Sequence, residues 1–344
     1  MSTDPIGQRN AGPMNRRRFI SIAGTYCGAS AIVGNLPGAA AHATANPEAG
    51  MQLNRWQGQA LGAWADIKLY HPSPIVARRA LVACTAEIER LEDLFSLYRP
   101  KSILNRLNKD GLIDNPDPDF AVLMQQAQDW GDRSNGAFDV TVQPLWGLYT
   151  KHQGNPPNTE IETALALVDY RAISVSARRI ALMKPDMAIT LNGIAQGFIT
   201  DRVAALLRDR GFGNVLVNLG EMQAIGPRPA KNPDGQAWQI GIEDPDNPGA
   251  LTTTLPLPAD RALATSGGYG MRFDGRQTHL LDPATGLGAN NYRSVSVFAD
   301  NATTADALST ALTVLPRDKA AALVAATPGS KALIFPREGS SFWL

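Results

Sequence analysis

Apolar and polar positions alternate in some parts of the chain and recur at helical spacing in others. Residues 63–71 (AWADIKLYH) alternate apolar with polar side chains, which predicts a half-buried strand. Ser73 and Pro74 then form a helix start, and the predicted helix runs to about Phe95. Its apolar side chains, Cys84 among them, recur at steps of three and four and so share one face. Cys84 is therefore predicted to be a core residue and not a nucleophile.

The rest of the chain mixes further helices with short strands. Helices are predicted from Asp117 to about Gly136, from Ala195 to Arg210, from Thr303 to just before Pro316, and after Asp318. Short apolar runs predict strands at 188–191, 215–219, 238–243, 252–257, 294–298 and 332–335. Because no regular βαβ repeat emerges, the predicted class is α+β.

The charge balance argues against two classes of partner. Lys plus Arg and Asp plus Glu both number 32, so the formal net charge is zero. Such a chain has no overall field that would attract nucleic acid or an anionic membrane surface. We expect neither partner.

The N-terminus has the pattern of an export signal. Residues 15–21 (NRRRFIS) resemble a twin-arginine motif, a small-residue apolar stretch follows, and residues 41–43 (AHA) form an A-x-A site. We expect residues 1–43 to be a cleaved signal peptide, 44–55 to be a linker, and the mature protein to be soluble in the periplasm. Cys27 lies within the signal, so only Cys84 would remain and no intramolecular disulfide could form.

Candidate metal-binding and catalytic residues lie in residues 264–286 and in the helix that follows. Asp306 and Thr310 are four residues apart, so their oxygens leave one helix face, and a carboxylate with a hydroxyl suits a hard cation such as Mg²⁺. The alternative is an acidic residue that favours the helix dipole, with Thr310 filling an ordinary helical position. His279 is either a general base or a structural histidine.

A glycine-containing joint precedes the helix at 195–210. In residues 191–198 (LNGIAQGF), glycines at a strand-to-helix turn expose backbone N–H groups where the helix dipole favours a phosphate. Many strand-to-helix joints contain glycine without binding a ligand. The segment is therefore either a phosphate site or an ordinary structural turn.

Five segments, in order, resemble the ApbE family of FAD:protein FMN transferases from about Trp56 to Pro316. They are SLYRPKSILNRLN, GAFDVTVQPLWGL, NGIAQGFITD, the ATSGGY…THLLDPATG block and TTADALSTAL. The resemblance implies an ApbE-like fold of mixed sheets with packed helices, forming a single large catalytic domain over residues 56–344.

The resemblance also implies a reaction and a set of site residues. FAD would be the substrate, Mg²⁺ the cofactor, and FMN would pass to a Thr or Ser hydroxyl of a client protein. Asp306, Thr310 and the backbone carbonyl of Ala195 would bind the metal, and His279 would act as the base. The residues implied to bind FAD are Tyr98, Asn105, Asp139, Gly193, Gln196, Thr265, Ser266, Gly267 and Asp282.

Three positions depart from the family pattern. Gln196 stands where the family usually has lysine, residues 219–221 (LGE) replace Gly-Gly-Asp, and residues 61–63 (LGA) replace Met-Gly-Thr. An amide donates hydrogen bonds but does not neutralise phosphate charge. Two alternatives to the transferase therefore stay open: a non-catalytic FAD-binding carrier or maturation partner, and an FAD pyrophosphatase.

The export motif together with NGIAQGFITDR is similar to NosX, the branch of the family associated with nitrous oxide reduction. That similarity implies the membrane flavoprotein NosR as the client.

Overall fold

A computed structural model describes residues 50–344 apart from 231–234, 248, 271 and 274–276. The predicted signal peptide, residues 1–43, lies outside the described residues. Within them, no helix is both long and apolar enough to cross a membrane. The helices are α2 (Pro74–Phe95), α3 (Ile103–Asp110), α4 (Pro118–Arg133), α5 (Gln143–Lys151), α6 (Asn158–Leu165), α7 (Ala195–Asp209), α8 (Ala302–Val314) and α9 (Arg317–Ala325), with 3₁₀ turns η1 (Val140–Val142) and η2 (Tyr170–Ala172). The strands are β1 (Gln52–Ala60), β2 (Ala63–His71), β3 (Leu112–Asp114), β4 (Ile173–Val175), β5 (Arg179–Leu182), β6 (Val215–Asn218), β7 (Met222–Ile225), β8 (Trp238–Glu243), β9 (Leu251–Leu257), β10 (Ala262–Gly267), β11 (Tyr292–Ala299), β12 (Lys331–Pro336) and β13 (Phe342–Trp343).

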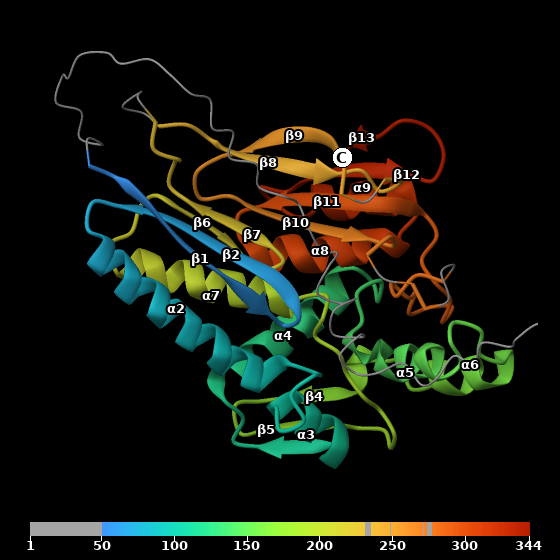
Figure 1. Cartoon of the computed structure of the whole chain (residues 1–344). Helices are drawn as coiled ribbons and strands as arrows, with labels where there is room; N and C mark the ends of the chain where they lie inside the picture. The colour runs from blue at the N-terminus through green and yellow to red at the C-terminus, as the bar shows by residue number, and fades with distance from the viewer. Residues whose placement is uncertain (1–49, 231–234, 248, 271, 274–276) are drawn as a thin grey trace, which may run out of the picture.

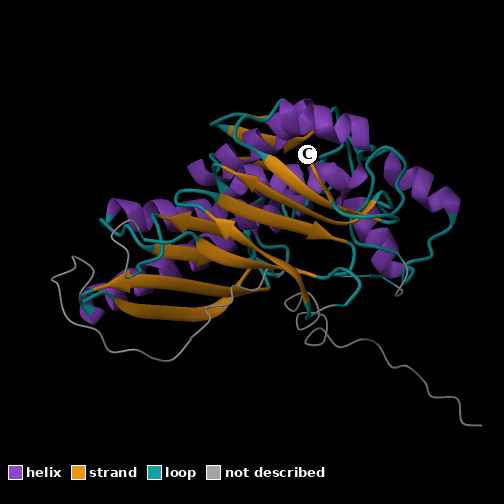
Figure 2. Ribbon diagram, turned by 90° about the horizontal axis from the view of Figure 1, so that it is seen from above, coloured by secondary structure: helices purple, strands orange, loops and turns teal. Residues whose placement is uncertain are grey.

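An eight-stranded antiparallel sheet forms the centre of the molecule. Its strand order is β1-β2-β6-β7-β10-β11-β12-β13. Helices α2, α7 and α8 cover one face, and the β8–β9 hairpin lies over the other (Figures 1 and 2). Trp238, Ile240 and Ile242 of β8 form a separate buried cluster with residues of the central sheet. Both faces of the sheet therefore contribute side chains to a buried cluster, and the mixture of helices and antiparallel strands confirms the α+β class.

The edge strand β1 corrects the predicted linker boundary. It begins at Gln52, so residues 52–55 belong to the sheet and not to a linker. The apolar pattern does not predict this strand, because its side chains are mostly polar and half or fully exposed. Its backbone nevertheless pairs with β2 along its whole length. Leu61 and Gly62 join the two strands with φ values of 46° and 82°, as a two-residue hairpin turn requires.

The predicted strand at 188–191 is wrong. The backbone there is not part of any ladder: Ile189 N–H donates to Asn108 Oδ1 at 2.7 Å, and the Ile189 carbonyl accepts from Asn108 Nδ2 at 2.9 Å. Thr190 N–H donates to the carbonyl of Val140 at 2.8 Å. A side-chain amide from α3 thus takes the place of a neighbouring strand.

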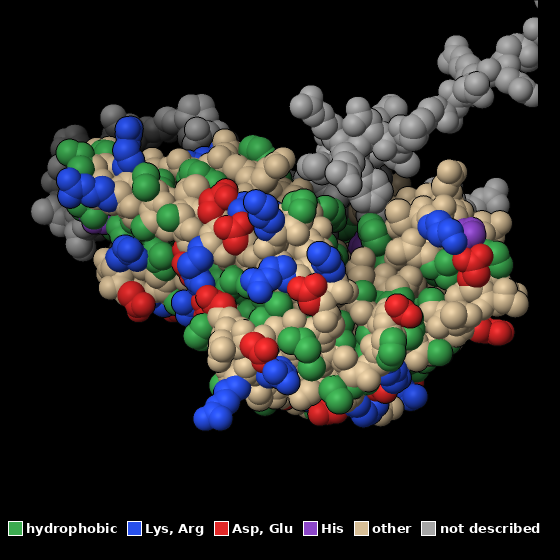
Figure 3. Space-filling model, turned by 90° about the horizontal axis from the view of Figure 1, so that it is seen from below, with side chains coloured by type: hydrophobic (Ala, Val, Ile, Leu, Met, Phe, Trp, Pro, Cys, Tyr) green, Lys and Arg blue, Asp and Glu red, His purple; other side chains and the backbone are tan. Residues whose placement is uncertain are grey.

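A smaller layer lies beside the sheet and its helices. It contains the β3-β5-β4 sheet with α3 and α4, and the α5–α6 pair projects to one side (Figure 1). Leu281 packs against Leu145 and Tyr149 of α5 and Ile161 of α6. This contact fixes the segment that carries His279 against the same layer. The face in Figure 3 intermingles basic and acidic side chains, in keeping with the zero net charge.

Candidate active site

Helices α7 and α8 cap one another at their N-termini. Asp306 in α8 accepts a hydrogen bond on Oδ2 from Gly197 N–H in the first turn of α7, at 2.9 Å. In return, Asp201 in α7 accepts from the N–H groups of Ala302 and Thr303 in the first turn of α8, at 2.7 and 2.8 Å. Each carboxylate satisfies N–H groups that a helix start leaves without an intrahelical partner. The two helix starts are therefore held at one place.

Gly197 allows this close approach. A Cβ at this position would lie 2.4 Å from the carbonyl oxygen of Ala302 and 2.8 Å from the Cα of Thr303. Both neighbours are backbone atoms that no rotamer change can move. The second glycine of the NGIAQG segment thus sets the helix separation instead of cradling a ligand.

Burial dominates the electrostatics of Asp306. Only 4% of the residue is exposed. Desolvation raises the pKa of its carboxyl to about 7, the charge of Asp201 adds to that rise, and the Gly197 N–H opposes it. Its other oxygen, Oδ1, forms no hydrogen bond with the part of the chain that the structure describes.

Three hydroxyl groups contact one another between β10 and α8, and two of them line the same cavity as Asp306. Ser266 Oγ on β10 lies 2.7 Å from Ser309 Oγ and 3.4 Å from Thr310 Oγ1 on α8. Ser309 also donates to the backbone carbonyl of Asp306 at 2.9 Å. A Cβ on Gly193 would lie 3.0 Å from Thr310 Oγ1, so the glycine joint packs directly on that hydroxyl. A carboxylate and hydroxyl oxygens in one place fit a hard divalent cation such as Mg²⁺.

The structure brings most of the predicted residues to one cavity of about 130 Å³. The predicted residues that line it are Asp139, Gly193, Gln196, Thr265, Ser266, Gly267, His279, Asp306 and Thr310. Ala195 is the buried first residue of α7, directly before Gln196, and its carbonyl as a metal ligand stays a prediction. His279 thus faces the same space as the oxygen donors of α8, although it lies 27 positions before Asp306 in the sequence.

Sequence reasoning did not include Glu221 in the site. It is 4% exposed, lines the same cavity, and accepts a hydrogen bond on Oε2 from Thr265 N–H at 3.3 Å. Burial raises the pKa of its carboxyl well above the usual value, and the charge of Asp306 raises it further. The signal in the sequence is that Glu221 occupies the position at which the family pattern Gly-Gly-Asp has its carboxylate.

Asp139 and Asp282 have structural partners. Asp139 Oδ1 accepts from Thr141 N–H at 2.8 Å and Oδ2 accepts from Tyr170 N–H at 3.1 Å. Asp282 closes the DPATG turn by accepting from Ala284 N–H at 2.9 Å. Both line a neighbouring hollow of about 700 Å³, which meets the smaller cavity at Asp139. Asp139 therefore borders both spaces, and a ligand bound in the smaller cavity would lie beside the larger hollow.

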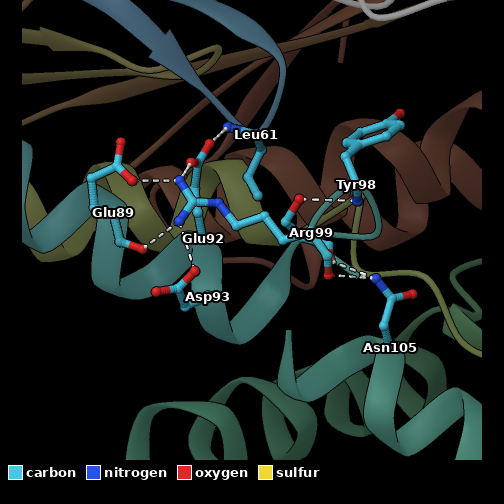
Figure 4. Close-up of polar contacts among 8 residues, drawn as sticks. Leu61, Glu89, Glu92, Asp93, Tyr98, Arg99 and Asn105 are labelled. Carbon is cyan, nitrogen blue, oxygen red and sulfur yellow. Dashed lines mark hydrogen bonds and ion pairs between the residues drawn. The ribbon is translucent and has the colours of Figure 1, made fainter. Parts of the chain in front are cut away.

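Tyr98 and Asn105 are not among the residues that line the cavity. Asn105 Nδ2 donates to the backbone carbonyls of Leu97 and Arg99 at 3.0 and 2.8 Å, which holds the loop that presents Tyr98 (Figure 4). Arg99 is anchored in turn by carboxylates of α2, including Asp93 at 2.7 Å. Tyr98 is 40% exposed. Asn105 thus shapes a loop, and Tyr98 offers an accessible ring beside the β1–β2 turn.

Comparison with known proteins decides the family. The ApbE family model matches residues 61–334. The chain belongs to the ApbE family. It is 30% identical over 302 residues to an FAD:protein FMN transferase of Treponema pallidum, covering 80% of this chain and 83% of that protein. It is 31% identical over 289 residues to the FAD:protein FMN transferase of Vibrio cholerae, covering 78% of this chain and 83% of that protein.

Solved ApbE structures share the fold. The flavin transferase ApbE from Vibrio cholerae superposes with a TM-score of 0.72 at 26% identity, covering 85% of this chain and 97% of that one. The apo flavinyl transferase ApbE of Pseudomonas stutzeri gives a TM-score of 0.72 at 28% identity, covering 86% and 94%. The resemblance seen in the sequence is thereby confirmed, and so is the ApbE-like fold.

Proposed function

We propose that this ApbE protein transfers FMN from FAD to a Thr or Ser hydroxyl of a client protein, with Mg²⁺ at the site of Asp306 and Thr310. The observation that supports it most directly is one cavity that holds His279, the Asp306 carboxylate and the Ser266 and Thr310 hydroxyls, in a chain of this family. Each of these residues alone has a structural explanation. Their convergence from β10, α8 and the segment at 279 does not.

The proposed step makes one phosphoester and breaks one pyrophosphate bond. The acceptor oxygen attacks the FMN phosphorus, the bond from that phosphorus to the AMP phosphate breaks, and AMP leaves. His279 takes the proton of the acceptor hydroxyl as general base. Bound Mg²⁺ would supply the positive charge that the pyrophosphate needs, since no Lys or Arg lines the cavity among the described residues.

The chain's own residues would position the reacting groups. The Ser266–Ser309 contact fixes β10 to α8, and the Gly197–Asp306 bond fixes the carboxylate that would bind the metal. The larger hollow beside Asp139 gives room for the parts of FAD that the small cavity does not hold.

A mass-spectrometric assay tests this function. The protein is incubated with FAD, Mg²⁺ and a purified candidate client domain, and the client is examined for covalently attached FMN on Thr or Ser. The expected result is an FMN adduct that requires both Mg²⁺ and Asp306. Asp306→Ala should abolish it while leaving some flavin binding.

Two other outcomes correspond to the alternatives. FAD binding without an adduct on any client would support the non-catalytic carrier, for which the neutral Gln196 in the cavity is the relevant observation. Release of AMP and FMN from FAD without a client would support the pyrophosphatase, in which water replaces the acceptor hydroxyl.

We further propose that the protein works in the periplasm after twin-arginine export, and that its client is a flavoprotein of nitrous oxide respiration such as NosR. The export motif NRRRFIS and the similarity of NGIAQGFITDR to NosX support this assignment. Co-expression with the periplasmic domain of NosR, followed by detection of covalent flavin on that domain, tests it. A domain that stays unflavinylated beside a flavinylated control client would exclude NosR.

A further inference from the structure

Two buried carboxylates face one small cavity. Glu221 and Asp306 are each 4% exposed and both line the space, where they interact as like charges. Among the described residues that line it, none is Lys or Arg. Buried charges persist in proteins only when they are paired or coordinate a metal. When both carboxyls are ionised, the arrangement therefore calls for a positive charge that the side chains lining this cavity do not supply.

Glu221 is held so that one carboxylate oxygen stays available. Its Oε2 accepts from Thr265 N–H at 3.3 Å, and its backbone carbonyl accepts from Thr200 Oγ1 at 3.3 Å and from Leu219 N–H at 3.0 Å. Within residues that the structure describes, Oε1 has no hydrogen-bond donor and no ion-pair partner. A carboxylate only accepts, so this oxygen needs a donor or a cation.

Contacts around the cavity close into a ring that contains both acids. Thr265, which holds Glu221, is followed by Ser266, whose hydroxyl lies 3.4 Å from that of Thr310. Thr310 is one helical turn from Asp306, which is bonded to Gly197. Gln196, the residue before Gly197, packs on Gly220, the residue before Glu221, and so closes the ring.

Gln196 completes the ring with a neutral group. A Cβ on Gly220 would lie 2.4 Å from Gln196 Nε2 and 2.8 Å from its Cδ, so the amide packs on the Cα directly before Glu221. A lysine at position 196 would bring an ammonium to this place and could pair with Glu221. Glutamine brings no charge, which leaves the position beside Glu221 open to another cation.

We propose that Glu221 is a further carboxylate ligand of the divalent cation bound through Asp306, and that Gln196 keeps this position free for the metal. The inference rests on the metal dependence of the function proposed above. Two carboxylates and flanking hydroxyls form an all-oxygen donor set, which suits Mg²⁺ and its EPR-visible substitute Mn²⁺.

Titration of the protein with Mn²⁺, followed by EPR in the absence of FAD and client, measures metal binding without catalysis. Four variants are compared with the wild type: Asp306→Asn, Glu221→Gln, Gln196→Lys and Glu243→Gln. Glu243 is the matched control, since it is a buried glutamate on β8 that accepts from Gly249 N–H at 2.7 Å and does not line the cavity. Circular dichroism verifies that each variant is folded.

Glu221→Gln and Gln196→Lys should each raise the Mn²⁺ dissociation constant roughly 10–100-fold, the first by removing a ligand and the second by placing an ammonium against it. Glu243→Gln should stay within about twofold of the wild type, as expected for a residue remote from the metal. A folded Glu221→Gln or Gln196→Lys protein that binds Mn²⁺ as the wild type does overturns the inference.

The set of variants separates this inference from the proposed function. Loss of Mn²⁺ binding only in Asp306→Asn leaves the metal-dependent transferase intact and removes Glu221 from the site. Unchanged binding in Asp306→Asn contradicts the metal site itself, and the assignment of Glu221 then fails with it.

Discussion

Replacing Gly197 with alanine tests the contact that brings the two halves of the site together. The new Cβ would lie 2.4 Å from the carbonyl oxygen of Ala302, 2.7 Å from its carbonyl carbon and 2.8 Å from the Cα of Thr303. All three atoms are backbone, so α7 and α8 must move apart. The movement pulls Gly197 N–H away from Asp306, whose carboxylate is buried.

The size of the effect follows from three contributions. Overpacking a rigid interior costs about 1–3 kcal/mol. Weakening a hydrogen bond to a buried charged group costs about 1.5–3 kcal/mol. Alanine in a helix interior recovers about 1 kcal/mol relative to glycine. The expected net loss in the free energy of unfolding is therefore about 1.5–5 kcal/mol.

Urea denaturation followed by tryptophan fluorescence measures this loss, with the m-value as a test that the native state stays compact. Gly147→Ala is the matched control: Gly147 also lies in a helix, α5, and a Cβ there has no neighbouring atom within 4 Å. That variant should be unchanged or about 1 kcal/mol more stable. Equal stability of the two variants would refute the argument that Gly197 sets the helix separation.

Three further predictions concern the same site. First, burial raises the pKa of Asp306 in the folded protein to about 7, above the ordinary value of 3.8 in the unfolded chain. Between these two pH values the folded apo protein holds a proton that the unfolded chain has lost, so apo stability should fall as the pH rises from about 4 to 7. The stabilisation by Mg²⁺ should grow over the same interval, because the metal needs the ionised carboxylate; a thermal shift on adding Mg²⁺ that does not depend on pH between 5 and 8 would contradict the raised pKa. Second, His279→Gln should slow FMN transfer about 10²–10⁴-fold with FAD affinity retained, measured by adduct formation and flavin fluorescence; a variant as fast as the wild type would remove His279 from the chemistry. Third, Asp201→Asn should lower the free energy of unfolding by about 1–2 kcal/mol, because it weakens the cap of α8. Asp300→Asn, at an exposed carboxylate, is the control. Equal urea midpoints for these two variants would show that the cap contributes nothing to stability.

Local sequence patterns determined the elements whose signal lies within one segment. The spacing of apolar residues in α2, the start of that helix at Ser73 and Pro74, and the end of α7 before Gly211 all follow from side-chain periodicity and capping chemistry. Strand β1 and the residues at 188–191 did not follow, because the first is stabilised by backbone pairing with β2 and the second by the side chain of Asn108. Neither partner is visible in the segment itself.

Family motifs in the sequence predicted that Asp306, Thr310, His279 and Ser266 belong to one site, and in the structure all four line one cavity. Only the tertiary structure decided which of these residues form hydrogen bonds and how burial and neighbouring charges shift their pKa values. The N–H of Gly197 binds a carboxylate 109 positions away. Burial in the space between β10, α7 and α8 raises the pKa of that carboxyl. Glu221 lies in the same cavity although nothing in its own segment indicates a carboxylate partner. Residue types and spacing are properties of the chain, whereas desolvation and electrostatic interaction depend on distances that exist only after the chain has folded.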